Sequence, residues 1–150
     1  MTASLAVTSA GTTVHISADV PATYDKAGYE ACTFTEIGEV ETVPDYGKQY
    51  KVVTWNPIGN RKTYKRKGSY DEGQLALSIA RAPSDAGQTI CIAARDSDAS
   101  YTFKIVTGTL YQYFPGQVTS YTSNRGGVDS IFRSTLNIAI DGEVLDTTAP

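Results

Sequence analysis

Alternation between apolar and polar side chains runs through most of the chain and predicts a mostly β fold. In the clearest stretch, Leu75, Leu77 and Ile79 share one face. In another, Cys32 and Phe34 are expected to face inward. Strands are predicted at 14–20, 31–42, 49–55, 72–81, 101–105, 110–114, 117–123 and 128–140. The pattern therefore predicts about seven or eight strands, most of them with one buried face.

One helix is predicted, at about 86–95. The segment from Asp85 to Gln88 has the form of a capping box, with an acidic N-cap residue three positions before a glutamine. Apolar residues then recur at helical spacing as far as Ala94. Antiparallel strands with a single helix are typical of a sandwich or barrel with the helix at one end. We therefore expect a mainly β, antiparallel β-sandwich or barrel with one flanking α-helix.

The chain divides into one folded unit and two ends. A length of 150 residues suits a single domain. Residues 1–13 are rich in Ala, Ser, Thr and Gly, and this composition predicts a flexible N-terminal arm. At the other end, a polar C-terminal tail is predicted at 143–150. The β domain is expected at 14–142. Within it, 44–68 is too polar to be buried on both faces, so we expect a long extended loop or hairpin there.

Charge is distributed unevenly and makes the 44–68 segment the first candidate site. Seven of the 13 basic residues lie between 48 and 67, with no acidic residue among them. The rest of the chain has six basic and 16 acidic residues, a net charge of −10. The basic side chains are Lys48, Lys51, Arg61, Lys62, Lys65, Arg66 and Lys67. Possible acidic counterparts lie just upstream, at Glu36, Glu39, Glu41 and Asp45.

Such a basic block can bind nucleic acid, an anionic surface or an acidic partner, or it can be a solvated hairpin. The negative charge on the rest of the chain weakens the nucleic-acid interpretation, because it repels phosphates. Opposite charges on different parts of one surface suit head-to-tail stacking of identical copies. The charge pattern therefore favours self-assembly, although other acidic partners stay open.

Catalytic chemistry is not indicated. An enzyme needs a convergent set of reactive groups, but the chain has a single histidine, His15, and no phosphate-binding or zinc motif. Cys32 and Cys91 are expected to be reduced thiols. No apolar run is long enough to cross a bilayer, and no signal peptide is recognised. We expect no enzyme activity, no cofactor, no metal and no membrane partner, and a cytoplasmic site of synthesis.

The order and spacing of several segments resemble the major tail tube proteins of long, non-contractile-tailed (lambda-like) bacteriophages. The resemblance covers roughly 30–142 and depends on the order of the segments, since none of them is diagnostic alone. The matching segments are Phe34–Val40, Pro44–Gly47 running into Tyr50–Val53, Arg66–Gly73, Arg81–Gln88, Gly116–Tyr121 and Val128–Ile131.

The resemblance implies a structural virion protein. Six copies are expected to form a ring with a continuous sheet as its inner wall, and rings are expected to stack into a hollow tube for DNA ejection. The 44–68 loop and the terminal arms are expected to reach the neighbouring ring. The implied partners are further copies, a tape-measure protein, a tail terminator and a distal tail protein. DNA is expected to pass through a negative lumen without sequence-specific binding. The expected location is the virion tail, after synthesis in the host bacterial cytoplasm.

Two alternatives stay open. The first is a tube component of a type VI-like secretion apparatus, which has the same ring-forming fold. The second is a monomeric β-sandwich that binds carbohydrate through exposed tyrosines. The candidates for the second are Tyr101, Tyr111, Tyr113 and Tyr121.

Overall fold

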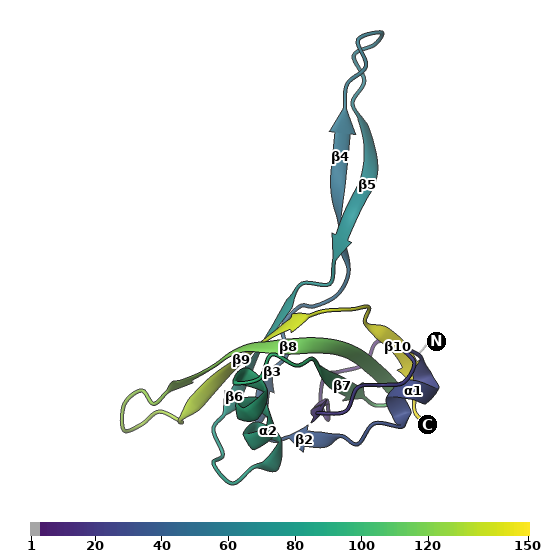
Figure 1. Cartoon of the computed structure of the whole chain (residues 1–150). Coiled ribbons are helices and arrows are strands. Elements are labelled where there is room, and N and C mark those ends of the chain that lie inside the picture. The colour runs from purple at the N-terminus through teal and green to yellow at the C-terminus, as the bar shows by residue number, and fades with distance from the viewer. Residues whose placement is uncertain (1–3) are drawn as a thin grey trace.

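The computed structural model describes residues 4–150, and it consists mainly of antiparallel strands (Figure 1). The strands are β1 (Thr13–Ser17), β2 (Thr35–Ile37), β3 (Val40–Thr42), β4 (Gln49–Trp55), β5 (Tyr64–Asp71), β6 (Gln74–Ala80), β7 (Tyr101–Thr107), β8 (Leu110–Asn124), β9 (Arg133–Ile140) and β10 (Leu145–Thr148). Within the described residues there are two helices, α1 (Lys26–Glu30) and α2 (Ala86–Arg95). The predicted fold class, an antiparallel β-sandwich or barrel with a flanking helix at 86–95, is confirmed.

The main sheet curls so far that the strands at the two ends of its order are joined by a short turn. Its strand order is β2-β1-β7-β8-β9-β6-β3, with β10 also paired to β8, and β4 and β5 form a separate two-stranded sheet. Strands β2 and β3 lie at opposite ends of this order, yet only Gly38 and Glu39 separate them in the chain. So short a turn brings the end of β2 to the start of β3, although the two strands do not pair with each other. The result is a barrel-like layer with a seam between β2 and β3.

Helix α2 packs over this seam. Asp85 caps the helix by accepting a hydrogen bond from the Gln88 backbone N–H at 3.0 Å, as the capping-box pattern predicts. Gly87 lies so close to the strand below that a Cβ atom there would be 2.1 Å from the Glu36 carbonyl oxygen. The absence of a side chain at Gly87 therefore lets the helix contact the β2 backbone directly.

The core lies inside the curled sheet and follows the predicted alternation. Leu75, Leu77 and Ile79 are completely buried, as expected. Leu136 and Ile138 of β9, the strand paired with β6, are also completely buried. Burial of an aliphatic side chain contributes about 1.5–3 kcal/mol, so these inward faces supply much of the stabilisation and fix the register of the strands.

A single strand replaces the two that were predicted at 110–114 and 117–123. Strand β8 runs through Pro115, which pairs with Thr102 of β7. The Pro115 carbonyl accepts from the Asp141 N–H at 3.0 Å, in the gap between β9 and β10. The N–H and C=O of a strand residue point to the same side, so the donor that proline lacks would face this gap. Pro115 is tolerated there because no ladder bond is lost.

Helix α1 was missed, because its segment was expected to be a loop. Asp25 caps it by accepting from the Gly28 N–H at 2.9 Å. Tyr29 is buried and its ring stacks on Tyr113 at 5.1 Å. Phe34 also contacts Tyr113, with ring centroids 5.9 Å apart, on the face of β8 opposite the core. The expectation that Phe34 faces the core is therefore wrong, and it belongs to a small aromatic cluster on the outer face of the sheet.

Several predicted boundaries also differ. The first strand ends at Ser17 rather than at 20, and the predicted strand at 31–42 is split by the Gly38–Glu39 turn. The last long strand starts only at Arg133, because 128–132 form a loop. The expected polar tail contributes β10, which pairs with β8 from Leu110 to Tyr113. Since β9 ends at Ile140, it leaves this part of the β8 edge available for β10.

Candidate assembly surfaces

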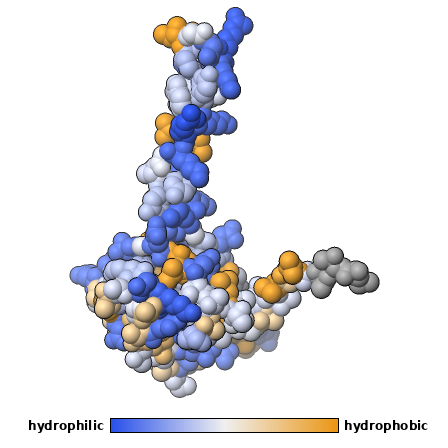
Figure 2. Space-filling view, turned by 90° about the vertical axis from the view of Figure 1, so that its right-hand side faces the viewer, coloured by the Kyte–Doolittle hydropathy of each residue, from blue (hydrophilic) through white to orange (hydrophobic). Residues whose placement is uncertain are grey.

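The β4–β5 hairpin projects from the domain and has no core of its own (Figure 1). It corresponds to the extended loop predicted at 44–68, although its second strand continues to Asp71. All seven residues of β4 are exposed. Figure 2 shows a narrow, mostly hydrophilic projection with isolated hydrophobic residues along its shaft and at its tip. A lone two-stranded hairpin is only marginally stable in water, so side-chain contacts along it become important.

Aromatic and basic side chains are paired in the half of the hairpin nearest the domain. The rings of Tyr50 and Tyr70 face each other across the strands, with centroids 5.2 Å apart. Lys48 lies 4.5 Å from the Tyr70 centroid and Lys67 lies 4.8 Å from the Tyr50 centroid. Each ring therefore carries a cation, an arrangement that holds the basic side chains against the strands.

The outer half repeats this arrangement. Trp55 stacks on Tyr64 at 5.4 Å with an interplanar angle of 21°. Arg66 lies 5.4 Å from the Trp55 centroid and Lys62 lies 5.2 Å from the Tyr64 centroid. An aromatic pair contributes about 0.5–1.5 kcal/mol, and an exposed cation–π contact about 0.5–1 kcal/mol. These contacts favour a preformed hairpin over a flexible loop.

The structure thus places all seven predicted basic residues on one projection. Four of them cover aromatic rings, whereas Lys51, Arg61 and Lys65 form no ion pair within residues 4–150. At the hairpin tip, residues 56–63, Ile58 is fully exposed beside Arg61. The hairpin therefore presents cationic and apolar groups together on its exposed surface.

Only one of the four predicted acidic counterparts lies at the base of the hairpin. Glu36 is on β2, Glu39 is in the turn with a φ of 61°, and Glu41 on β3 bonds Arg133 at 3.1 Å. These three lie along the seam. Asp45 is in the loop that leads into β4 and lines a pocket at the base of the hairpin.

Other acidic residues, which were not among the predicted counterparts, gather at that base. Glu143 accepts from Lys48 Nζ at 3.0 Å and from the Tyr70 hydroxyl at 3.5 Å. The hydrogen bond to Glu143 raises the pKa of Lys48. Glu72 directly follows β5, so its position at the base of the hairpin can be inferred from the sequence. Glu143 and Asp146 come close to the base of the hairpin only because β10 pairs with β8.

Two of these acids, Glu72 and Asp146, border a pocket of about 430 Å³, here termed the root pocket. It is lined by Tyr46, Gly47, Lys48, Glu72, Gln112, Val144 and Asp146. The Tyr46 hydroxyl donates to Gln112 Oε1, and Gln112 Nε2 donates to Asp146 Oδ1 at 2.8 Å. Burial, and then the charge of Asp146, raise the pKa of Tyr46. Glu72 is only 6% exposed, and its Oε1 has no hydrogen-bond partner within the described residues.

Backbone edges form a second candidate surface. Strand β7 pairs with β8 only as far as Gly116, so from Gln117 to Asn124 the strand is hydrogen-bonded to β9 alone. At the other end of the row β8-β9-β6-β3, β3 is bonded only to β6. Unpaired strand edges readily pair with another chain unless they are protected. This four-stranded row can therefore be extended by further copies.

The outward face of that row is polar but carries almost no charge. The partly or fully exposed side chains on it are Gln74, Ala76 and Ser78 of β6, Thr135, Asn137 and Ala139 of β9, and Gln117, Ser120 and Thr122 of β8. Asn137 Nδ2 donates to Ser120 Oγ at 2.7 Å. Arg133, at the end of the β9 row, is paired with Glu41. The face is thus hydrated and electrically neutral.

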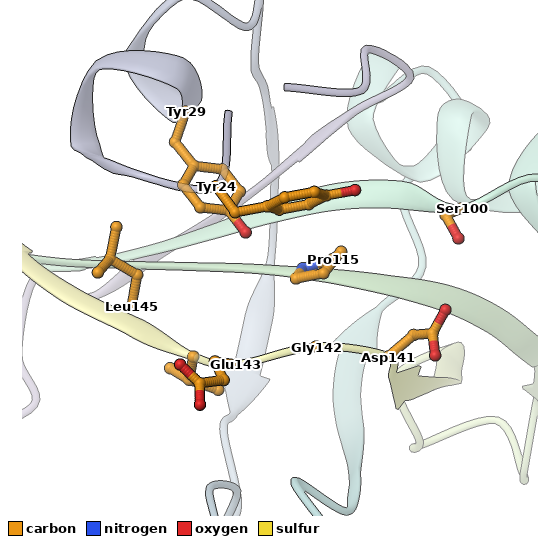
Figure 3. A pocket seen from close by; sticks show the side chains of 9 residues that line it. Tyr24, Tyr29, Ser100, Pro115, Asp141, Gly142, Glu143 and Leu145 are labelled. Atoms are coloured by element: carbon orange, nitrogen blue, oxygen red, sulfur yellow. The ribbon is translucent and has the colours of Figure 1, made fainter. Parts of the chain in front are cut away.

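A third hollow, of about 430 Å³, lies beside α1 (Figure 3). Tyr24 and Tyr29 lie on one side of it, and the chain from Asp141 to Glu143 lies on the other.

The tyrosines considered for carbohydrate binding do not form an exposed platform, because Tyr113 and Tyr121 are buried. The structure therefore gives no exposed row of those rings.

Three further features concern metal ligands, membrane-spanning helices and thiols. Within residues 4–150, no group of three or more His, Cys, Asp and Glu residues is placed to hold a metal, and no helix is long and apolar enough to span a membrane. Cys32 and Cys91 are free thiols, and burial raises the pKa of Cys91 to about 12. A thiol with so high a pKa is unreactive at neutral pH.

Comparison with known proteins identifies the fold. No family model matches the sequence, and a search of curated proteins finds no match. Among solved structures, a chain of the anti-feeding prophage baseplate has a TM-score of 0.70 at 10% identity, covering 97% of both chains. The sheath/tube terminator of the extracellular contractile injection system PVC has a TM-score of 0.67 at 11% identity, covering 97% of this chain and 99% of that one. The SPP1 tail tube protein has a TM-score of 0.62 at 12% identity, covering 92% and 77%. The chain therefore has a tail-tube-like fold, and these neighbours are structural tail components rather than enzymes.

Proposed function

We propose that this protein is a tube subunit of a phage tail or tail-like particle, and that it acts by assembling into stacked rings. The observation that carries the proposal is a domain with two unpaired strand edges and a projecting hairpin that lacks a core. Both features are incomplete in one copy, and other copies can complete both. The likeness to tube, terminator and baseplate proteins supports the same function.

Ring formation is proposed to occur by sheet extension. The β8 edge from Gln117 to Asn124 pairs with the opposite edge of the next copy, so that the β8-β9-β6-β3 row continues around the ring. Closure removes the exposed edges that would otherwise aggregate. Six copies, the number expected from the resemblance, give a barrel of about 24 strands. At about 4.8 Å per strand and a tilt of about 45°, its radius is about 26 Å, which leaves a hollow channel.

The neutral outward face of the row is proposed to line this channel. The resemblance implies a negative lumen, whereas this face carries uncharged Ser, Thr, Asn and Gln side chains. Passing DNA would meet little attraction and little repulsion from such a wall. Passage of DNA, like partnership with a tape-measure protein, a tail terminator and a distal tail protein, stays an expectation of the proposal.

Stacking is proposed to use the hairpin. From Gln49 to the tip, about 3.3 Å per residue gives a reach of about 35 Å. A globular domain of the remaining size has a radius of gyration of about 14 Å, and hence a diameter of about 35 Å. The hairpin of one copy can therefore extend along the whole height of a copy in the next ring.

Electron microscopy combined with native mass spectrometry tests this function. Wild-type protein is expected to form rings of six and hollow tubes as its concentration rises. A variant in which 56–63 are replaced by Asn-Gly, which keeps a tight hairpin turn, is expected to form rings but not tubes. Tubes of unchanged length from the shortened variant would remove the hairpin from the stacking mechanism.

A second form of the same function is the inner tube of a contractile injection apparatus, which the two neighbours from contractile systems favour. The discriminating measurement is immunogold labelling of native particles. Label along the shaft of a long flexible tail favours the non-contractile phage tail, and label inside a contracted sheath favours the injection apparatus.

A further inference from the structure

We propose that the root pocket of one copy binds the guanidinium of Arg61 from the hairpin tip of a second copy in the adjacent ring. This inference rests on the proposed function, which it deepens by naming the receiving site and the residue received. It also shifts the acidic partner of the basic hairpin away from Glu36, Glu39 and Glu41, which lie along the seam.

The root pocket contains a carboxyl group that lacks a partner. Glu72 is 94% buried, and its Oε1 accepts no hydrogen bond within the described residues. A buried polar atom without a partner costs stability unless something else supplies the bond. Oε1 itself is enclosed by the protein, but Glu72 lines the pocket, so a cation that enters from outside can compensate the buried carboxyl group electrostatically.

The surroundings of Glu72 favour a cationic donor. Asp146 lines the same pocket and accepts from Gln112 at 2.8 Å. Lys48 also lines it, but its ammonium is bonded to Glu143 at 3.0 Å. Two carboxyl groups therefore face the pocket, and the cation nearest to them is engaged at the rim. An arginine, whose planar fork bonds carboxylates through two N–H groups, fits such a site.

The hairpin tip carries an available arginine. Arg61 forms no ion pair or cation–π contact within residues 4–150, whereas Lys62 covers the Tyr64 ring. The tip is also the part of the hairpin farthest from its own root (Figure 1). The tip therefore holds Arg61 far from the acidic residues at its own root and leaves it available to another copy.

The length of the hairpin places its tip at the level of the root pocket in the next copy. The hairpin leaves the domain at the root, and its reach of about 35 Å equals the height of about one domain. In a head-to-tail stack, the tip of the lower copy arrives at the level where the upper copy starts its own hairpin. That level is the root pocket of the upper copy, so the same contact repeats in every ring.

A metal ion is a poorer occupant. Calcium takes six or more oxygen ligands and usually several carboxylates, but the described residues provide no cluster of three acidic or other ligating side chains. Charge complementarity with the hairpin, by contrast, is present in every copy.

Charge reversal and exchange test the contact. Arg61→Glu and Asp146→Arg are each expected to shorten tubes at least ten-fold, and the double variant is expected to restore most of the length. Glu72→Gln, which keeps the size of the side chain, is expected to weaken stacking and to make tube length more sensitive to salt. Glu30→Arg, an exposed charge change at the end of α1, is the matched control and should leave tubes unchanged.

The outcomes separate this inference from the proposed function. Wild-type length in both single variants overturns the pocket contact, although tube formation itself would still support the function. Tubes that dissolve in EDTA and re-form with Ca²⁺ identify a metal site and also overturn it. Wild-type protein that forms neither rings nor tubes overturns the proposed function. Should Asp146→Arg fail to fold, Arg61→Glu decides alone, because Arg61 is exposed and has no core contact.

Discussion

Replacement of Gln88 by Met removes the polar group that closes the seam of the sheet. Gln88 is completely buried. Its Nε2 donates to the carbonyls of Gly38 at 3.1 Å and Ala80 at 3.0 Å, and its Oε1 accepts from the Ala82 N–H at 2.9 Å and the Tyr121 hydroxyl at 3.2 Å. Methionine has a similar volume but makes none of these bonds. The Arg81 guanidinium also donates to Oε1, at 3.3 Å, but it is partly exposed and water can replace that bond. At about 1 kcal/mol for each of the other four bonds, the variant should lose about 4 kcal/mol of unfolding free energy.

Urea denaturation followed by far-ultraviolet circular dichroism measures this loss, because the single tryptophan lies on the hairpin and does not report on the core. For a domain of this size the midpoint of thermal unfolding should fall by about 10 °C. Gln74→Met, at an exposed position of β6, is the matched control and should change stability by less than about 0.5 kcal/mol. A loss below about 1 kcal/mol for Gln88→Met would refute the reasoning that this side chain fastens the seam.

Three further variants test other parts of the structure. Burial, and then the charge of Lys104, lower the pKa of His15 from 6.5 to about 4; since the unfolded chain binds more protons between these values, stability should fall as pH drops from 6.5 to 4, and His15→Gln should flatten that dependence in denaturation curves. Trp55→Ala should leave the unfolding free energy within about 0.5 kcal/mol of wild type but broaden the amide resonances of the hairpin and shorten tubes, because the ring packs only on the hairpin. Gly28→Ala should cost about 2 kcal/mol or more in thermal unfolding, since its Cβ would lie 1.9 Å from the Thr23 carbonyl oxygen.

The sequence was sufficient to predict those elements whose structure depends on residues close together in the chain. Helix α2 was predicted at its observed bounds because Asp85 and Gln88 form its cap within a few residues. The inward face of β6 was predicted because Leu75 and Leu77 alternate with polar residues. The projection of the basic segment followed from its polarity, which left it no place in a core.

Predictions were wrong where long-range pairing decides the structure. Two strands were predicted, at 110–114 and 117–123, but the gap between β9 and β10 accommodates Pro115 within a single strand. Three of the four acidic residues predicted as counterparts of the basic block lie along the seam instead, and Glu39 is one of them. Glu143 and Asp146 reach the hairpin only because β10 continues along the edge of β8. Sequence spacing contains no information about that juxtaposition.

The central claim is that identical copies join edge to edge into rings, and that a preformed basic hairpin links each ring to the next. Negative-stain electron microscopy of purified wild-type protein at increasing concentration tests it most directly. Six-membered rings at low concentration and hollow tubes at high concentration are expected. Particles that stay single at every concentration, together with absence of the protein from the tail shaft of native particles, would contradict the claim.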